Sequence, residues 1–435
     1  MRLSGTRVTA IASGKGFGNQ LWDLAGTIPT LDLRLAENKS LVDATTGQQL
    51  VTFTRASSGT YVGSDGLIKT AATNEARFDH NPTTGESLGL LVEEQRANLL
   101  LYSACDSNWP SGGFGTATYN LGLSALGVFS GVQVASSGQN WHSIYRTGIN
   151  LTASTVYAFT LFYRAGTSGR VRLTFRNNGT VTETVVNGLA GNLSVSAQFA
   201  GSAAILSQYL CSDGLTYVVT GTYTPNGTNV DHWLRIGPDS TVSGQTVIAL
   251  GAQLEAGAFP TSYIPTTTAT VTRSADVASI TGANFSSWYR QDEGTLFTDT
   301  VNREAYTGSN VFPCILQIDD GTNNNRISYD NSVLGSGYRY NLPCHSGGVS
   351  QGELNQFGFA SGAARWASAF RTNDFALAIN LSPSVVSTRT SGTLPNAMTQ
   401  LRIGSGFGKQ FTGTIRRLTY WPTRLGNEVL QTITQ

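Results

Sequence analysis

The sequence has 435 residues, which is too long for one sandwich domain and fits two or three compact domains. Only 13% of the residues are charged, and the net charge of +1 comes from lysines and arginines scattered along the chain. This pattern excludes the dense basic surface of a nucleic-acid-binding protein. Long surface helices are also disfavoured, because the abundant Gly, Ser, Thr and Asn suit turns and strands. We therefore predict an all-β protein.

The chain carries no recognisable membrane or export signal. No segment approaches the roughly 18 consecutive apolar residues of a membrane span, and Lys15 and nearby glycines interrupt any signal-peptide core. We expect synthesis in the cytoplasm and no membrane insertion. The cysteines lack CxxC spacing, which argues against zinc or redox motifs and favours free buried thiols. Cys314 and Cys344 flank one predicted hairpin and could be bridged in an oxidising environment.

The first 103 residues predict short strands joined by tight turns. Residues 30–35 alternate like a strand, and turn signals lie at 63–66 and 81–85. The segment 51–103 reads VTFTRASSGTYVGSDGLIKTAATNEARFDHNPTTGESLGLLVEEQRANLLLYS. It resembles a segment found in phage head-spike, tail-fibre and related virion proteins. That resemblance implies a position on the virion surface, with residues 1–103 attaching the chain to capsid or tail proteins.

Residues 104–265 predict an antiparallel sandwich or jelly roll. Residues 156–163, 170–175 and 215–223 are rich in β-branched and aromatic side chains and are separated by turns. The sequence ALGAQLE at 249–255, followed by FPTSYIPT at 259–266, resembles the last strand and exit of jelly-roll carbohydrate-binding modules of phage adhesins. The Thr-rich run 266–272 predicts an extended linker.

Residues 271–435 predict a second antiparallel sandwich. The alternation at 294–298, 375–379 and 401–404 is typical of sandwich strands. The segment IRRLTYWPTRLGNEVLQTIT at 415–434 resembles the closing strand and short helix of concanavalin-A-like, laminin-G-type sandwiches in phage proteins. Little helix is expected beyond the last ten residues, and no repeat of the kind that builds a β-helix is present.

The sequence offers no catalytic constellation and predicts no cofactor. Its acidic residues are scattered and many lie in turns, whereas glycoside hydrolysis needs two facing carboxylates. Neither an HExxH nor a GxSxG motif occurs. The run from Asp319 and Asp320 to Asn325 could hold calcium or form the turn of a hairpin, and the Asp-Gly pair favours the turn. We predict no metal site and no enzyme activity.

Sugar binding needs exposed aromatic rings framed by hydrogen-bonding groups. The candidates in the middle module are Trp109, Trp141, Tyr145 and Trp233, since Trp109 and Trp141 adjoin polar or Gly-rich segments. The alternative for each is a core or loop-packing aromatic. Trp288, Trp366 and Trp421 are weaker candidates.

Together the resemblances imply a head spike, fibre or decoration subunit of a phage particle that adheres to a host-surface polysaccharide. Two alternatives stay open: a tail fibre or capsule-cleaving tailspike, and a purely architectural decoration protein that binds no glycan. We expect a homotrimer, because phage adhesins combine several weak sites. The expected location is the virion surface, reached by host lysis, with no nucleic-acid partner.

Overall fold

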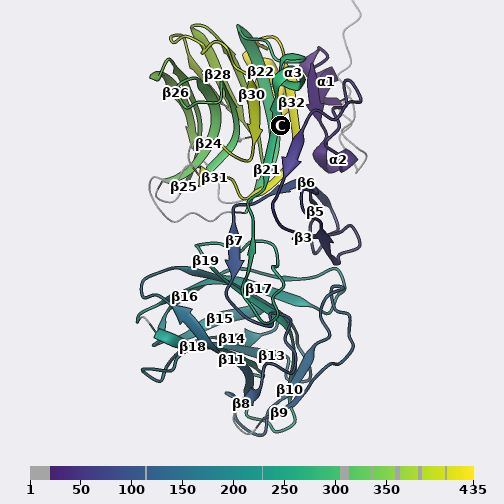
Figure 1. The fold of residues 1–435 in the computed structure, drawn as a ribbon, viewed down its shortest axis with the longest axis vertical. Coiled ribbons are helices and arrows are strands. Elements are labelled where there is room, and N and C mark those ends of the chain that lie inside the picture. The colour runs from purple at the N-terminus through teal and green to yellow at the C-terminus, as the bar shows by residue number, and fades with distance from the viewer. Residues whose placement is uncertain are drawn as a thin grey trace, which may run out of the picture.

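The computed structural model describes residues 20–112, 115–227, 229–303, 313–334, 337–357, 363–380, 385–406 and 409–435. It confirms the all-β prediction, and the main sheets pair into two sandwich modules stacked along the long axis (Figure 1). The helices of the described residues are Gln20–Ala25 (α1), Leu35–Asn38 (α2), Gly282–Ser286 (α3) and Asn427–Thr434 (α4). None of these helices has the length and apolar character needed to cross a membrane.

The upper module in Figure 1, named here the terminal sandwich, is built from both ends of the chain. Sheet 1 runs in the order β29 (Val386–Arg389), β28 (Asp374–Ile379), β27 (Ala363–Arg371), β22 (Glu293–Asn302), β32 (Gly413–Trp421), β6 (Ser87–Val92) and β5 (Phe78–His80), and β1 (Leu31–Leu33) also pairs with β32. Sheet 2 runs in the order β2 (Thr52–Thr54), β21 (Val277–Thr281), β30 (Gln400–Ile403), β23 (Pro313–Asp319), β24 (Arg326–Leu334), β25 (Gly337–Ser346) and β26 (Val349–Phe357), and β31 (Lys409–Gln410) also pairs with β23.

Sheets 1 and 2 enclose one hydrophobic core. Leu296 and Trp366 enter it from sheet 1, and Leu316 and Leu401 enter it from sheet 2. The closing strand and short helix predicted at 415–434 are confirmed as β32 and α4. Helices α1 and α4 cover the outer face of sheet 1, where alanines of β27 and β28 leave room for them.

The N-terminal strands differ from the predicted attachment region over residues 1–103. Leu31 and Leu33 of β1 pair with β32, β6 pairs with the same strand, and Phe53 of β2 pairs with Ala278. These three strands therefore complete the terminal sandwich, whereas β3 (Gly59–Val62) and β4 (Ile68–Ala71) pair with each other in a separate two-stranded sheet. Alternation along a segment predicts a strand but not its partner, and these partners lie hundreds of residues away. Residues 1–19 of the predicted region lie outside the described residues.

The lower module in Figure 1, named here the inserted module, lies between the two halves of the terminal sandwich in sequence. Sheet 3 runs in the order β16 (Gly201–Leu210), β17 (Tyr217–Pro225), β12 (Tyr157–Arg164), β19 (Thr246–Ala256), β10 (Val132–Ala135) and β9 (Thr116–Thr118). Sheet 4 runs in the order β15 (Asn192–Gln198), β14 (Thr182–Leu189), β13 (Arg170–Asn177), β18 (Asn229–Gly237), β11 (Ser143–Leu151) and β8 (Ser111–Gly112). The strands predicted near 156–163, 170–175 and 215–223 are confirmed as β12, β13 and β17.

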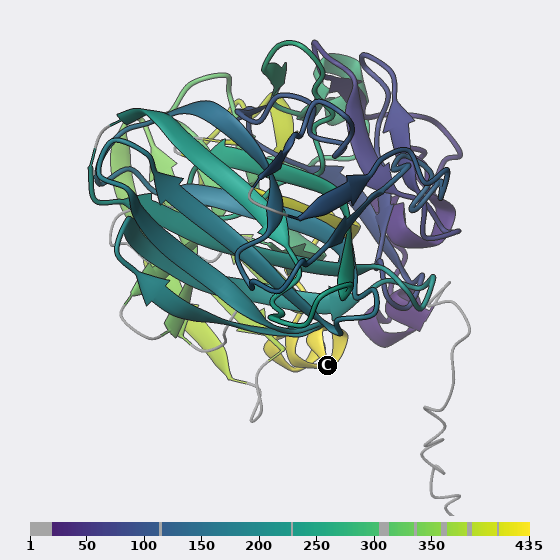
Figure 2. The ribbon, with the colours of Figure 1, turned by 90° about the horizontal axis from the view of Figure 1, so that it is seen from below.

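Sheets 3 and 4 face each other across a second core, to which β12 contributes Phe159 and β13 contributes Leu173 and Phe175. Because side chains alternate along a strand, the residues between them point the other way. Arg172, Thr174 and Arg176 therefore lie on the outer face of sheet 4. Figure 2 looks onto the inserted module from the end away from the terminal sandwich.

Two short strands connect the modules side by side. The chain leaves the terminal sandwich through β7 (Arg96–Asn98) and returns through β20 (Val271–Arg273), and these strands pair antiparallel. The Thr-rich run 266–272 links the two modules, as its composition predicts; residues 267–269 bend, and Val271 and Thr272 are extended in β20. Thr266 is buried, and its backbone N–H donates to Ser103 Oγ at 2.9 Å. Only Thr266 is buried in this run, and residues 267–272 are exposed.

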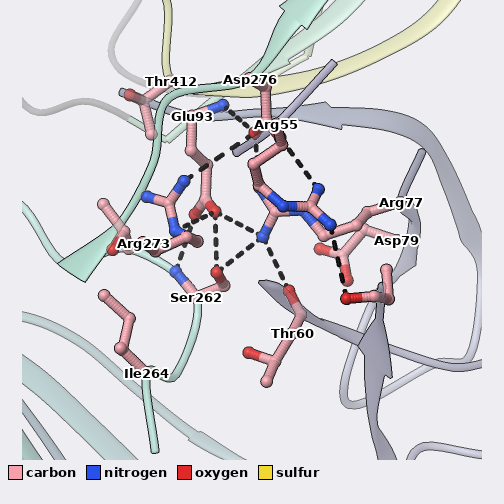
Figure 3. A network of polar contacts seen from close by, with 12 residues as sticks. Arg55, Thr60, Arg77, Asp79, Glu93, Ser262, Ile264, Arg273, Asp276 and Thr412 are labelled. Carbon is pink, nitrogen blue, oxygen red and sulfur yellow. Dashed lines mark hydrogen bonds and ion pairs between the residues drawn. The ribbon is translucent and has the colours of Figure 1, made fainter. Parts of the chain in front are cut away.

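A buried ionic network lies where the connecting strands meet the terminal sandwich (Figure 3). Asp276 pairs with Arg55 at 3.1 Å and with Arg77 at 2.5 Å. Glu93 pairs with Arg77 at 2.8 Å and with Arg273 at 3.4 Å. All five side chains are at most 1% exposed. We name this set the junction network.

Glu93 also links the network to the inserted module. Its carboxylate accepts hydrogen bonds from the backbone N–H and the hydroxyl of Ser262, both at 2.7 Å. Burial alone would raise the pKa of Glu93, but Arg273 and Arg77 outweigh burial and hold that pKa well below its usual range. The two modules are therefore joined by charged contacts as well as by the paired strands.

The predicted hairpin near Asp319 is confirmed, since β23 and β24 pair across residues 320–325. Asp319 accepts a hydrogen bond from Gln317 and pairs with Arg402 at 3.0 Å. Within the described ranges, no group of three or more His, Cys, Asp or Glu could hold a metal ion. Cys314 and Cys344 are free and buried on strands separated by β24, so the disulfide considered above does not form here.

Candidate functional site

The structure separates Trp109 from the other predicted sugar-binding residues. Trp109 is 0% exposed, lies in the core of the inserted module, and donates from Nε1 to the backbone carbonyl of Tyr102 at 2.6 Å. The prediction that its ring is available to a sugar is therefore wrong. A polar and glycine-rich neighbourhood in the sequence does not reveal that a loop folds its one large side chain inward.

Tyr145 and Trp233 are brought together on the outer face of sheet 4. Their rings stack with centroids 5.1 Å apart and planes 12° apart. On the other side of Trp233, the guanidinium carbon of Arg176 lies 5.5 Å from the ring centre. Because both faces of Trp233 have neighbours, its ring edge points outward. A sugar would meet the rims of these rings and their polar groups more readily than a flat face.

Trp141 is the most exposed of the four predicted residues, at 37%. Its ring packs edge to face against His142, with centroids 4.8 Å apart. Its backbone carbonyl accepts a hydrogen bond from Arg235 Nη2 at 3.1 Å, which holds the loop against sheet 4. Arg235 pairs in register with Tyr145, so the loop of Trp141 adjoins the stacked rings.

Three arginines surround one glutamate on the same face. Glu183 of β14 pairs with Arg235 at 2.8 Å, Arg176 at 3.2 Å and Arg172 at 3.6 Å. Register explains the arrangement, because Arg176 lies directly between Glu183 and Trp233 on neighbouring strands. The alternation of RVRLTFR at 170–176 would have indicated an arginine-rich outer face, and the sequence reasoning did not draw on it.

The pKa of Arg235 reflects this crowding of positive charge. Burial lowers its pKa, Glu183 raises it, and the neighbouring Arg176 and Arg172 lower it further, with a net decrease. Beyond Trp233, Asp231 accepts a hydrogen bond from the indole Nε1 at 2.7 Å.

We name this surface the arginine–aromatic face, made up of Trp141, Tyr145, Arg172, Arg176, Glu183, Trp233 and Arg235. This face is directed away from the terminal sandwich, because the opposite side of the inserted module, the outer face of sheet 3, is directed toward the terminal sandwich. It offers guanidinium donors and aromatic edges at the surface, which is chemistry suited to binding a hydroxyl-rich or anionic group.

A cavity lies between the two modules. This cavity of about 420 Å³ is lined on one side by the outer face of sheet 3, including Phe162 and Tyr209, and on the other by residues such as Tyr61 and Asp79. Asp79 is the single carboxylate among its described lining residues, and it forms an ion pair with Arg303. The described lining therefore lacks the pair of carboxylates that glycoside hydrolysis requires.

No protein-family model matches this sequence, and no curated protein matches it. Among solved structures, the mouse laminin alpha1 domains LG4-5 match with 10% identity over 66% of this chain and 88% of that chain, with a TM-score of 0.22. The tandem CBM22 domains of Xyn10C from Paenibacillus barcinonensis match with 8% identity over 76% and 99% of the two chains, with a TM-score of 0.26. The GH43 protein BlXynB from Bacillus licheniformis matches with 10% identity over 88% and 76%, with a TM-score of 0.23. Scores this low carry no information on what the chain binds.

Proposed function

We propose that this chain is a non-catalytic adhesin subunit of a phage particle, and that the arginine–aromatic face binds a host-surface glycan. The observation that carries the proposal is the exposed Trp141 beside Tyr145 and Arg235 on the sheet face directed away from the other module. A sugar ring presents apolar C–H groups and hydroxyl groups together, and this face offers an aromatic surface with donors next to it.

The virion setting rests on the sequence resemblance of residues 51–103, and we propose the virion surface as the location. A single face of this size binds weakly, since one aromatic contact contributes about 1 kcal/mol. We propose a homotrimer for the same reason, because several weak sites displayed together gain avidity. A non-catalytic role is supported by the intermodule cavity, where Asp79 is the lone described carboxylate and is paired.

The test is binding of the purified full-length protein to an array of bacterial polysaccharides. We expect binding that falls about fivefold in Trp141→Ala, with an unchanged melting temperature. Phe357→Ala is the control, because Phe357 is a 64% exposed aromatic on β26 of the terminal sandwich, away from the face. A folded wild-type protein that binds no glycan would favour the architectural alternative. Release of reducing sugar from a bound capsule would contradict the non-catalytic proposal.

A further inference from the structure

The arginine–aromatic face has more positive than negative charge. Arg172, Arg176 and Arg235 share the single carboxylate of Glu183, which leaves a surplus of two positive charges around it. Asp231, two residues before Trp233 on β18, accepts a hydrogen bond from the indole and reduces this surplus from two charges to one. On the same strand, by contrast, Arg170 has Asp239 as its own partner at 2.7 Å. A surplus of arginine at one place is unusual in a chain with a net charge of only +1.

Two of these arginines keep donors available. Arg172 donates from Nε to Thr174 Oγ1 at 3.3 Å and approaches Glu183 at 3.6 Å. Arg176 donates from Nη1 to Glu183 Oε1 at 3.2 Å. Each guanidinium carries five N–H groups, so most of those on Arg172 and Arg176 have no acceptor among the described residues. Their side chains are 17% and 23% exposed, which leaves them within reach of a ligand.

Glu183 shows which chemical group this arrangement accommodates. Its carboxylate is held by guanidinium groups from β13 and β18, and it orders those groups before any ligand arrives. Planar guanidinium forks match carboxylate geometry and form hydrogen bonds stronger than those to neutral hydroxyl groups. A second carboxylate above the sheet would meet the remaining donors and offset the surplus charge.

We infer that the glycan bound by this face is acidic, and that Arg172 and Arg176 bind the carboxylate of a uronic-acid-type sugar. The inference rests on the proposed function and names its ligand class. Nucleic acid is a less suitable ligand, because Glu183 and Asp231 would face its regularly spaced phosphates and the neighbouring Arg170 is already paired with Asp239.

The experiment compares polygalacturonate with its carboxyl-reduced counterpart, both as ligands of the full-length protein. We expect the acidic polymer to bind at least tenfold more tightly than the reduced polymer, and its binding to weaken as salt is raised. Equal affinity for the two polymers overturns the inference and leaves the proposed function intact. Binding to neither polymer nor to any other glycan overturns both.

Variants test whether Arg172 and Arg176 contact the carboxylate of the sugar. Arg172→Gln and Arg176→Gln should each weaken binding of polygalacturonate about tenfold and leave binding of the reduced polymer unchanged. Arg170→Gln is the matched control, because it removes an arginine of the same strand whose charge Asp239 already balances. An effect of Arg170→Gln as large as the other two would overturn the assignment. Tighter binding of single-stranded DNA, with the same dependence on Arg172 and Arg176, would overturn the choice of ligand.

Discussion

The substitution Asp276→Asn is expected to be among the most destabilising single changes in the chain. Asp276 is 0% exposed and balances the charges of Arg55 and Arg77 within the junction network. It also accepts a hydrogen bond from the backbone N–H of Glu93 at 2.8 Å. Asparagine keeps the shape of the side chain but removes its charge. Three buried arginines would then have only one carboxylate, that of Glu93.

The expected loss follows from the burial of these partners. Removing one member of a buried ion pair typically destabilises a protein by about 3–5 kcal/mol, because the remaining charge is left uncompensated. The amide of asparagine adds a second penalty, since its N–H groups face donors. Asp276 pairs with Arg55 and Arg77 and also lies 3.9 Å from Arg273, so we expect a loss toward the upper end of that range.

The assay is denaturant-induced unfolding, followed by tryptophan fluorescence and far-ultraviolet circular dichroism in parallel. If the modules unfold in separate steps, the loss should appear in the transition of the terminal sandwich. Asp292→Asn is the matched control, because Asp292 forms an ion pair with Arg290 at an exposed position. This substitution should produce no measurable change in the free energy of unfolding. A loss below about 1 kcal/mol for Asp276→Asn, or one equal to the control, would refute the reasoning.

Three further outcomes can be checked by unfolding. Trp109→Ala should destabilise the inserted module by about 3–5 kcal/mol, since it removes a fully buried ring; a loss under 1 kcal/mol would contradict the core position. The pKa of Glu93 is held low in the folded protein, so the stability that its charge contributes is present above the unfolded pKa of about 4.3 and is lost as pH falls below that value. Glu93→Gln should therefore make the melting temperature depend less on pH in this acidic range. Burial raises the pKa of Asp330 to about 7, so the stability from its neutral form is complete below about pH 4 and declines up to about 7. Asp330→Asn should remove that decline between about pH 4 and 7, and an unchanged profile would show that Asp330 does not titrate there.

The sequence predicted the strands well because each strand is a local pattern. The alternation in β13 follows directly from Val171, Leu173 and Phe175 pointing inward, and no distant contact is needed to read it. The insertion was missed because it depends on pairing between β1 and β32, which lie at opposite ends of the chain. Strands with similar apolar faces could pair in several combinations, and the packing of the complete core decides which pairing forms.

In the candidate site, too, the sequence predicted residue types but not the contacts that depend on the fold. Tyr145 and Trp233 were predicted as aromatic contacts, yet their mutual stacking depends on the register of β11 against β18. Trp109 was predicted at the surface because its neighbours are polar, although one buried hydrogen bond to Tyr102 satisfies its only polar atom and lets it lie in the core. Composition describes a neighbourhood in sequence, whereas exposure is decided by neighbours in space.

The topology leads to a last prediction about where the chain can be cut. The core of the inserted module is formed by residues from Leu100 to Leu254, so a fragment of residues 96–273 retains all of it together with the paired strands β7 and β20. We expect this fragment to fold on its own and to show a sharp thermal transition. The fragment 104–265, which follows the boundaries predicted from the sequence, loses Leu100, a core residue at 0% exposure, and the contact of Thr266 with Ser103. It should melt several degrees lower, since removing one buried leucine alone costs about 2–5 kcal/mol. Equal melting temperatures for the two fragments would show that β7 and β20 belong to the terminal sandwich and add nothing to the inserted module.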